Sequence, residues 1–371
     1  MNYKVLAINP GSTSIKIALF EDEQELFSTN IKLIKTNSSY AYDKSQYFEL
    51  RKAIVEEVSS RGYNMEDIDA YSSRGAKNVS SPAGVYEIDD KILEFCDLNQ
   101  MIPHPKTFGP LLAKDFEDKF GGKAYILNAS VDEFDDIVRV TGYLNVWRES
   151  SIHVLSQKEV GKRVAEKINK NYDDVNFIIA HLGGGITITA HKKGRMVDSS
   201  HGGNGDGPIA PTRSGFVPNM EVIKLCYSGK YTQQEMLQRT YVKGGLMEHL
   251  RTDDAREIEK RIVDGDEYAK LVYDSMIYQI AKYIGSLAII MEGNVDGIVL
   301  TGGMANSNYA VEKIKKYVDW IAKVFVMTGE YEMEYLGLSV LRVLKGEEDA
   351  LIYTGIPMFD PKVYLKKIRE Y

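Results

Sequence analysis

The sequence predicts an α/β protein made of two domains that share one plan, each with a sheet and covering helices. Residues 5–20 read as an apolar strand, a turn of small polar residues and a second, alternating strand, and residues 177–191 repeat this plan around three glycines. A chain of 371 residues is also long for a single hydrophobic core. Each domain is therefore expected to begin with a β-hairpin.

The first half continues from its hairpin in the order strand, helix, strand, helix, strand. Hydrophobic periodicity places these elements at residues 25–33, 47–60, 69–75, 110–120 and 123–128. The second half repeats the order after its own hairpin. Its elements are expected at residues 195–198, 219–227, 232–240, 267–292, 295–303, 323–327 and 333–344, with a helix that begins at Ser307. We predict domains of 1–150 and 151–349, with 350–371 returning to the first.

Composition excludes several classes of protein. The net charge of -7 argues against a nucleic-acid or anionic-membrane partner, which would favour a basic face. Cys96 and Cys226 are too few for a disulfide framework. The first residues lack a secretory pattern, and the apolar runs are too short to span a membrane. We expect a cytoplasmic protein.

The turn of the first hairpin carries groups that suit a phosphate. Backbone N–H groups, hydroxyls and one ammonium are close together there, on Asn9, Gly11, Ser12, Ser14 and Lys16. Such groups hold a terminal phosphoryl group and a hydrated Mg²⁺. The segment lacks the Walker pattern, and alone it would pass for an ordinary turn.

The second hairpin is more specific. Gly183, Gly184 and Gly185 interrupt a strand pattern, which destabilises it unless a bulge forms or another group must approach the backbone. Gly302 and Gly303 end a later strand just before a helix, which fits a contact with adenine or ribose. Together the two hairpins predict a nucleotide held in a cleft between two related domains.

These segments resemble the superfamily that contains acetate kinases, sugar kinases, heat-shock ATPases and actin. Longer motifs are similar to those of the butyrate kinases, a short branch of the acetokinase family, over essentially the whole chain. They are N-P-G-S-T-S-x-K, A-H-L-G-G-G-I-T-I-x-A-H-K-K-G-R-M-V-D, R-S-G-x-x-P, K-L-C-Y-S-G-K-Y-T, K-G-G-L, L-T-G-G and L-R-V-L-K-G-E-E. The resemblance implies duplicated ribonuclease-H-like (actin-like ATPase) domains with mixed five-stranded sheets and a nucleotide cleft between them.

The resemblance also implies the reaction. Members of the family transfer a phosphoryl group directly, in line, between ATP and a short-chain fatty acid, here butyrate, and form ATP in reverse. Two alternatives stay open: another short or branched acid (propionate, isobutyrate, acetate), or a weakly active nucleotide-binding paralogue. A homodimer or larger homo-oligomer is implied as well.

The matching motifs assign roles to charged residues. Arg74 and Arg213 stand at the two arginine positions of the family, where planar guanidinium groups suit phosphate and carboxylate oxygens. His153 and His181 are candidate donors to the transferring phosphoryl group, and His104 is expected to shape the acyl or phosphoryl pocket.

Magnesium is expected to arrive with the nucleotide and to need few protein ligands. Glu330 stands at the acidic position of the family, Glu332 is close enough in sequence to be the true match, and Asn9 could contact the water shell of the metal. No spacing of His, Cys and Asp suggests zinc.

Two departures from the family pattern concern the first domain. Asn128 stands where the family usually has an Asp, and Thr107 stands where an Asn is expected. The loss of the Asp charge is tolerable for a carboxylate acceptor, which is already ionised near pH 7 and needs no general base. It argues against a sugar kinase, which must activate a hydroxyl. The acyl chain is left open.

Overall fold

The computed structural model describes residues 2–11, 14–32, 44–75, 80–96, 107–127 and 130–368. The chain forms two compact units, a first unit of 1–132 with 331–371 and a second unit of 133–330. The limits 1–150 and 151–349 remain a prediction for the two domains, which limited proteolysis tests.

The first unit is built on a mixed sheet in the order β3-β2-β1-β4-β6-β5. The strands are β1 (Lys4–Pro10), β2 (Ser14–Glu21), β3 (Gln24–Lys32), β4 (Ala70–Arg74), β5 (Val85–Glu87) and β6 (Lys123–Leu127). β1 runs antiparallel to β2 and parallel to β4. We expected five strands, but this sheet has six. The additional one is the edge strand β5, whose three residues are too few to show alternation.

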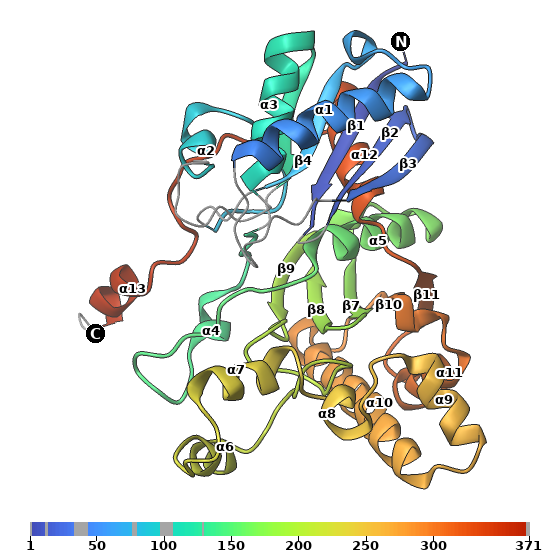
Figure 1. The fold of residues 1–371 in the computed structure, drawn as a ribbon. Coiled ribbons are helices and arrows are strands. Elements are labelled where there is room, and N and C mark those ends of the chain that lie inside the picture. The colour runs from blue at the N-terminus through green and yellow to red at the C-terminus, as the bar shows by residue number, and fades with distance from the viewer. Residues whose placement is uncertain are drawn as a thin grey trace. The chain divides into compact units, whose positions relative to one another are not determined.

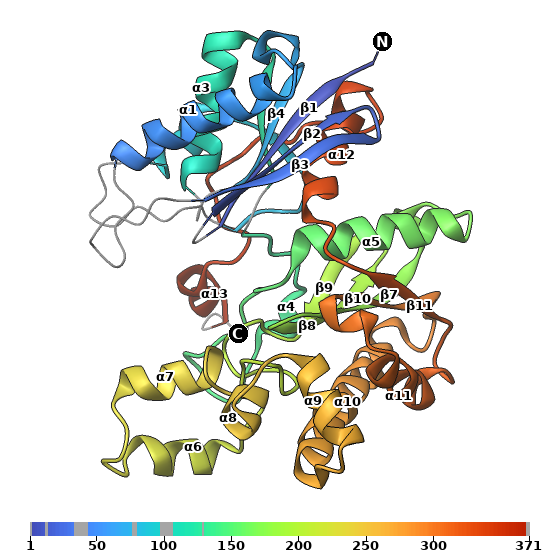
Figure 2. The ribbon, with the colours of Figure 1, turned by 45° about the vertical axis from the view of Figure 1, so that its right-hand side comes forward.

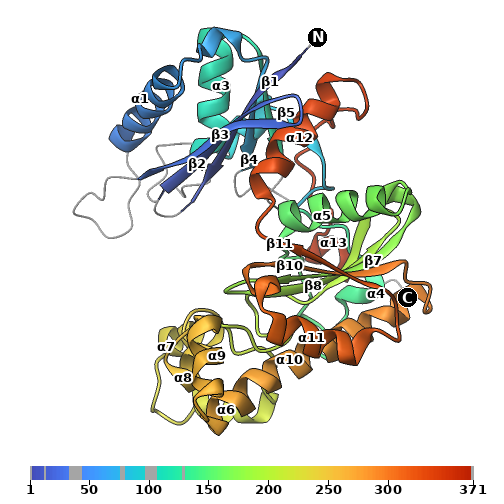
Figure 3. The ribbon, with the colours of Figure 1, turned by 90° about the vertical axis from the view of Figure 1, so that its right-hand side faces the viewer.

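Helices cover both faces of this sheet. α1 (Lys44–Ser60) and α3 (Phe108–Phe120) lie on one face, and α12 (Glu332–Leu344) lies on the other (Figures 1 and 3). Neighbouring residues of β4 reach the two layers: Tyr71 packs its ring against Phe116 of α3, while Ser72 Oγ donates to the carbonyl of Leu336 at 2.7 Å. Among the residues of this unit that the structure describes, the other short helices are η1 (Met65–Asp67), α2 (Asp90–Glu94) and α13 (Pro361–Ile368).

The second unit repeats the topology. Its sheet has the order β11-β10-β7-β8-β9, with β7 (Asn176–Leu182), β8 (Ile186–Lys192), β9 (Arg195–Ser199), β10 (Gly297–Gly302) and β11 (Val324–Thr328). The chain order of these strands matches that of β1, β2, β3, β4 and β6, and β7 pairs antiparallel with β8 and parallel with β10. The duplication predicted from the two hairpins is confirmed.

Helices again form two layers on the sheet of the second unit. α10 (Glu267–Ala288) and α11 (Asn308–Val318) cover one face, and α5 (Val154–Lys167) covers the other (Figure 2). The other helices are α4 (Asp136–Arg139), η3 (Tyr172–Asp174), α6 (Asn219–Cys226), α7 (Gln233–Tyr241), α8 (Leu246–Leu250), α9 (Ala255–Val263), η4 (Ile289–Met291) and η5 (Gly303–Asn306). Within the part of the chain that is described, no helix is both long and apolar enough to cross a membrane.

Candidate functional site

One edge of the second sheet gathers the glycine turns that the sequence singled out. β7 and β10 are parallel neighbours with Thr301 opposite His181, so the turns that follow both strands lie at the same edge. Gly302 has φ +88°, and a Cβ there would lie 2.6 Å from the carbonyl oxygen of Leu182. Only glycine fits this approach, which brings Gly302 against the backbone of Leu182, the residue before Gly183.

Arg213 lies directly against the glycine turn of β7 and β8. A Cβ on Gly185 would overlap its guanidinium group, so the absence of a side chain at Gly185 makes room for Arg213. The neighbouring Thr212 fastens this loop to the turn, because its backbone N–H and its hydroxyl donate to the carbonyl of Gly184 at 3.2 and 3.0 Å. The fold therefore places Arg213 against the glycine turn between β7 and β8.

The side chain of Arg213 is partly buried, and two of its guanidinium nitrogens are shielded from solvent without a partner in the part of the chain that the structure describes. Among the described residues, its Nε and Nη1 atoms have no hydrogen-bond partner. Burial also lowers the pKa of Arg213 below its ordinary value. An isolated buried cation is costly, and an anion with several oxygens would satisfy it. Arg213 is thus suited to hold a phosphate.

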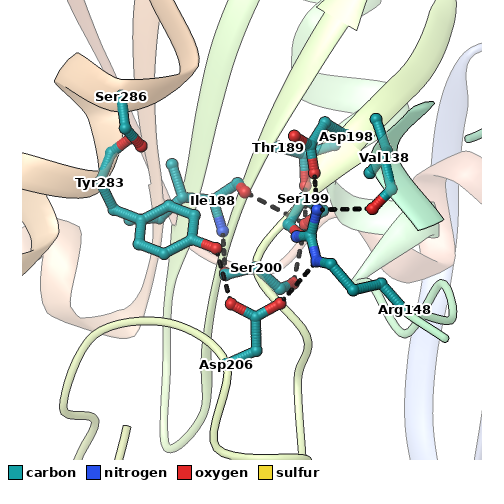
Figure 4. Close-up of polar contacts among 10 residues, drawn as sticks. All are labelled: Val138, Arg148, Ile188, Thr189, Asp198, Ser199, Ser200, Asp206, Tyr283 and Ser286. Carbon is teal, nitrogen blue, oxygen red and sulfur yellow. Dashed lines mark hydrogen bonds and ion pairs between the residues drawn. The ribbon is translucent and has the colours of Figure 1, made fainter. Parts of the chain in front are cut away.

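Arg148 of the same unit shows what a fully paired arginine looks like (Figure 4). Its Nε donates to Asp206 at 3.0 Å and its Nη1 to Asp198 at 2.9 Å, while its Nη2 donates to the carbonyl of Ser199 at 2.6 Å. Burial acts to lower the pKa of Arg148, but the two carboxylates outweigh burial and the pKa is raised. Tyr283 completes the cluster by donating to Asp206 at 2.8 Å. Arg148 is a structural cross-link, in contrast to Arg213.

His153 and His181 form a stacked pair at the same edge. His181 lies near the end of β7, and His153 immediately precedes α5. Their ring centroids are 4.2 Å apart with planes 17° from parallel. His153 Nδ1 lies 2.8 Å from the hydroxyl of Thr187 on β8. The structure thus brings together two histidines predicted from widely separated segments.

The first unit holds a second group of predicted residues, centred on Glu332. Glu332 is the first residue of α12, and its Oε2 accepts a hydrogen bond from Asn9 Nδ2 at 2.8 Å. Arg74, at the end of β4, contacts the same oxygen through Nη1 at 3.5 Å. Because a carboxylate only accepts, Asn9 directs Nδ2 to Glu332 and keeps its Oδ1 for a donor or a cation.

The other predicted residues fall in different places. Gly11 and Ser14 close the first hairpin turn, with the Gly11 N–H donating to the Ser14 carbonyl at 2.8 Å, and Lys16 lies opposite Asn9 in the β1–β2 register. Glu330 is exposed, and its side chain forms no hydrogen bond or ion pair with the described residues. Three predicted residues lie outside the described residues: Ser12, His104 and Asn128.

The described residues contain no group of three His, Cys, Asp or Glu side chains that could hold a metal ion by themselves. One carboxylate, Glu332, with the amide oxygen of Asn9 beside it, suits Mg²⁺ that arrives already bound to phosphate oxygens and water. Glu332 and Asn9 therefore suit a metal ion that brings most of its ligands with it, and they are too few to enclose a metal ion by themselves.

Two residues beside His153 were not predicted from the sequence. Thr187 forms a hydrogen bond with His153, and Gln157 forms one with Thr187. The available signal was the alternation I-T-I-T-A-H of residues 186–191. It predicts that one face of β8 is apolar and that the other presents Thr187, Thr189 and His191.

Comparison with known proteins places these features in context. A sequence model of the acetokinase family matches residues 143–324. Butyrate kinase 2 of Clostridium acetobutylicum is 38% identical over 355 residues, which cover 95% of this chain and 100% of that protein.

Solved structures agree on the fold. Acetate kinase of Porphyromonas gingivalis superposes with a TM-score of 0.77 at 20% identity, covering 93% of this chain and 100% of the other. A propionate kinase from Francisella tularensis gives a TM-score of 0.73 at 19% identity, with 91% and 98% covered. At these identities the likeness concerns the fold alone, which is the actin-like ATPase fold implied by the sequence motifs.

Proposed function

Since the chain belongs to the acetokinase family, we propose that it transfers the terminal phosphoryl group of ATP to the carboxylate of butyrate and catalyses the reverse, ATP-forming reaction. The observation that carries the proposal is the partly buried guanidinium of Arg213, whose shielded Nε and Nη1 donors have no partner among the described residues, beside a turn of three glycines. That arrangement recognises a phosphate rather than a neutral ligand.

The nucleotide is assigned to the glycine edge of the second unit. The open backbone of Gly183, Gly184 and Gly185 lets phosphate oxygens approach the N–H groups, and Gly302 and Gly303 do the same for the adenosine part. The first hairpin, with Asn9, Gly11, Ser12, Ser14 and Lys16, is assigned to the transferred phosphoryl group.

The reaction requires correctly positioned substrates and hydrogen-bond donors, but it requires no general base. A carboxylic acid is ionised near pH 7, so the acceptor is already a nucleophile. Arg213 holds the equatorial oxygens of the transferred group, which gather negative charge in the transition state. His153 and His181 donate to the same oxygens, and Arg74 orients the acceptor carboxylate.

When bound, Mg²⁺ neutralises phosphate charge. We assign Glu332 and Asn9 to its water shell, and prefer Glu332 to Glu330 because Glu332 is held by two other predicted site residues. His104 as a pocket residue and Asn128 as the replacement for an aspartate remain predictions.

The test is an assay of ADP release with straight and branched acids of two to six carbons. We expect the highest kcat/KM with butyrate and a collapse of turnover in Arg213→Ala with the fold intact. Arg256→Ala, at a side chain that is 90% exposed, is the matched control and keeps full activity.

Other results would select the alternatives. A maximum with propionate, isobutyrate or acetate would change the acid and keep the reaction. ATP binding without acid-dependent turnover would identify a weakly active nucleotide-binding paralogue. Turnover with a sugar and none with any acid would refute the substrate class.

Location and assembly follow as secondary proposals. Cys96 and Cys226 are both free thiols, which suits the reducing cytoplasm. The homodimer or larger homo-oligomer implied by the family motifs is tested by light scattering of the purified protein.

A further inference from the structure

A buried polar layer lies between β8 and α5 in the second unit. Thr187 and His191 of β8 and Gln157 of α5 are each completely buried. Polar side chains in such a place must pair with one another, because an unpaired buried donor or acceptor costs about 1–3 kcal/mol. Their pairing is therefore informative about where the hydrogens lie.

The layer is a continuous chain of hydrogen bonds that ends at His153. Tyr172 Oη lies within hydrogen-bonding distance of His191 Nδ1, and His191 Nε2 lies 3.0 Å from Gln157 Oε1. Gln157 Nε2 donates to Thr187 Oγ1 at 2.9 Å and to the Thr187 carbonyl at 3.1 Å. Thr187 Oγ1 lies 2.8 Å from His153 Nδ1.

The direction of the first bonds is set by the carbonyl of Thr187. A carbonyl only accepts, so the amide group of Gln157 must face it with Nε2, and Oε1 must face His191. His191 Nε2 therefore carries a proton, and Nδ1 accepts from the hydroxyl of Tyr172. Burial, followed by the charge of Lys158, lowers the pKa of His191 well below its ordinary value, which agrees with a neutral ring.

The direction of the last bond follows from Thr187. Its oxygen has two acceptor sites, and these are used by Gln157 Nε2 and by the backbone N–H of His153 at 3.5 Å. The hydroxyl proton is left for His153 Nδ1. The opposite arrangement would bury the hydroxyl donor of Thr187 without a partner.

We propose that Gln157 and Thr187 are positioning residues that hold His153 as a neutral imidazole with its proton on Nε2, and so as a hydrogen-bond donor toward the transferring phosphoryl group. The catalytic part of this proposal rests on the proposed function. The tautomer rests on the hydrogen bonds alone. A donor into Nδ1 opposes protonation of that atom, and it also fixes the rotation of the ring.

The stacking of His153 on His181 agrees with this assignment. Two imidazolium rings with centroids 4.2 Å apart would repel each other, whereas a neutral ring stacks without that cost. The chain of donors also points in one direction, from Tyr172 to His153, and aligned hydrogen bonds reinforce one another.

The test reads the tautomer directly from ¹⁵N spectra of the full chain labelled at its six histidines, at about pH 8, above the ordinary imidazole pKa. The His153 signals are identified by their loss in His153→Gln. We expect the Nε2–H form in the wild type and in Thr187→Ser, and a loss of that preference in Thr187→Val. Gln157→Glu should reverse the chain, because a carboxylate accepts from Thr187 and the hydroxyl can then no longer donate to His153.

The control is Thr189→Val, which removes an equally buried hydroxyl of β8 that bonds to Ser199 and lies outside the chain. It should leave the His153 tautomer and kcat unchanged. Thr187→Val should lower kcat about tenfold with KM nearly constant, and Thr187→Ser should restore it.

Each outcome decides one of the two proposals. A wild-type His153 that is protonated or in the Nδ1–H form overturns the tautomer assignment. A tautomer that switches in Thr187→Val while kcat stays unchanged overturns the positioning role. The expected tautomers in a protein that phosphorylates no acid would support the hydrogen-bond chain and refute only the proposed function.

Discussion

Gly185→Ala is the sharpest test of how the arginine at the glycine edge is placed. The backbone of Gly185 is not in the left-handed region, so alanine is tolerated by the main chain. The atoms nearest to the new methyl group all belong to the guanidinium of Arg213, which it would overlap. The substitution therefore acts on Arg213 without touching its chemistry.

The size of the effect follows from that overlap. An ordinary Cβ contact is 3.4–4 Å, so the guanidinium must withdraw by more than about 1 Å. A displacement of that order at a positioned catalytic group costs about 100-fold in rate, or about 2.7 kcal/mol of transition-state stabilisation. The effect should appear in kcat/KM with both substrates, and thermal unfolding should change little.

The assay is a double-mutant cycle on acid-dependent ADP release. Gly185→Ala should lower kcat/KM about 100-fold in the wild type and have almost no effect in Arg213→Ala, where the space is free. Gly285→Ala in α10 is the control, since a Cβ there meets nothing within 4 Å, and it should keep full activity while stabilising the helix by about 0.5–1 kcal/mol. Equal losses from Gly185→Ala in both backgrounds would refute the reasoning.

Two further predictions concern the metal and pH. Glu332→Gln should raise the Mg²⁺ concentration for half-maximal rate at least about tenfold, and Glu330→Gln should leave it nearly unchanged; a larger shift for Glu330 would reverse the assignment. Burial lowers the pKa of His191, so below pH 6.5 the unfolded chain binds a proton that the folded chain excludes. The free energy of unfolding therefore decreases as the pH is lowered. His191→Asn should flatten the acid side of the stability profile by about 1.4 kcal/mol per pH unit, measured by denaturant unfolding, whereas the same change at the exposed His249 should not; equal slopes would contradict the burial of a neutral ring.

Much of the fold was predictable because its elements have clear periods. The hairpin at 5–20 and the one at 177–191 each combine a continuous apolar strand with an alternating one, and both formed as expected. α5 was missed because four buried positions in succession are polar or charged in sequence: Ser156, Gln157, Lys158 and Glu159. These residues interrupt the apolar positions of the helix, Val154, Val160, Val164 and Ala165, so its apolar stripe is hard to recognise in the sequence.

The site was predictable in its residue types but not in its pairings. Glu330 and Glu332 flank Tyr331 and lie two positions apart, and no periodicity in the sequence distinguishes their roles. The distinction arises because Glu332 begins α12, whose packing on the first sheet brings its carboxylate to Asn9. That contact joins residues more than 300 positions apart, which one sequence cannot reveal.

Arg148 and Arg213 show where the functional information lies. Both are arginines of loops in the second unit, and burial acts to lower the pKa of both. Arg148 meets two carboxylates and two carbonyls, so its charge is neutralised within the fold and an added anion would gain little from it. Arg213 is left with buried donors that no described residue accepts from, and the fold bears that cost beside a turn of three glycines. A protein can retain such an unfavourable feature in its free state because a bound ligand relieves it. The anion then forms the hydrogen bonds that no group of the protein forms. The unpaired arginine, rather than the better-bonded one, is therefore the residue expected to bind the phosphoryl group.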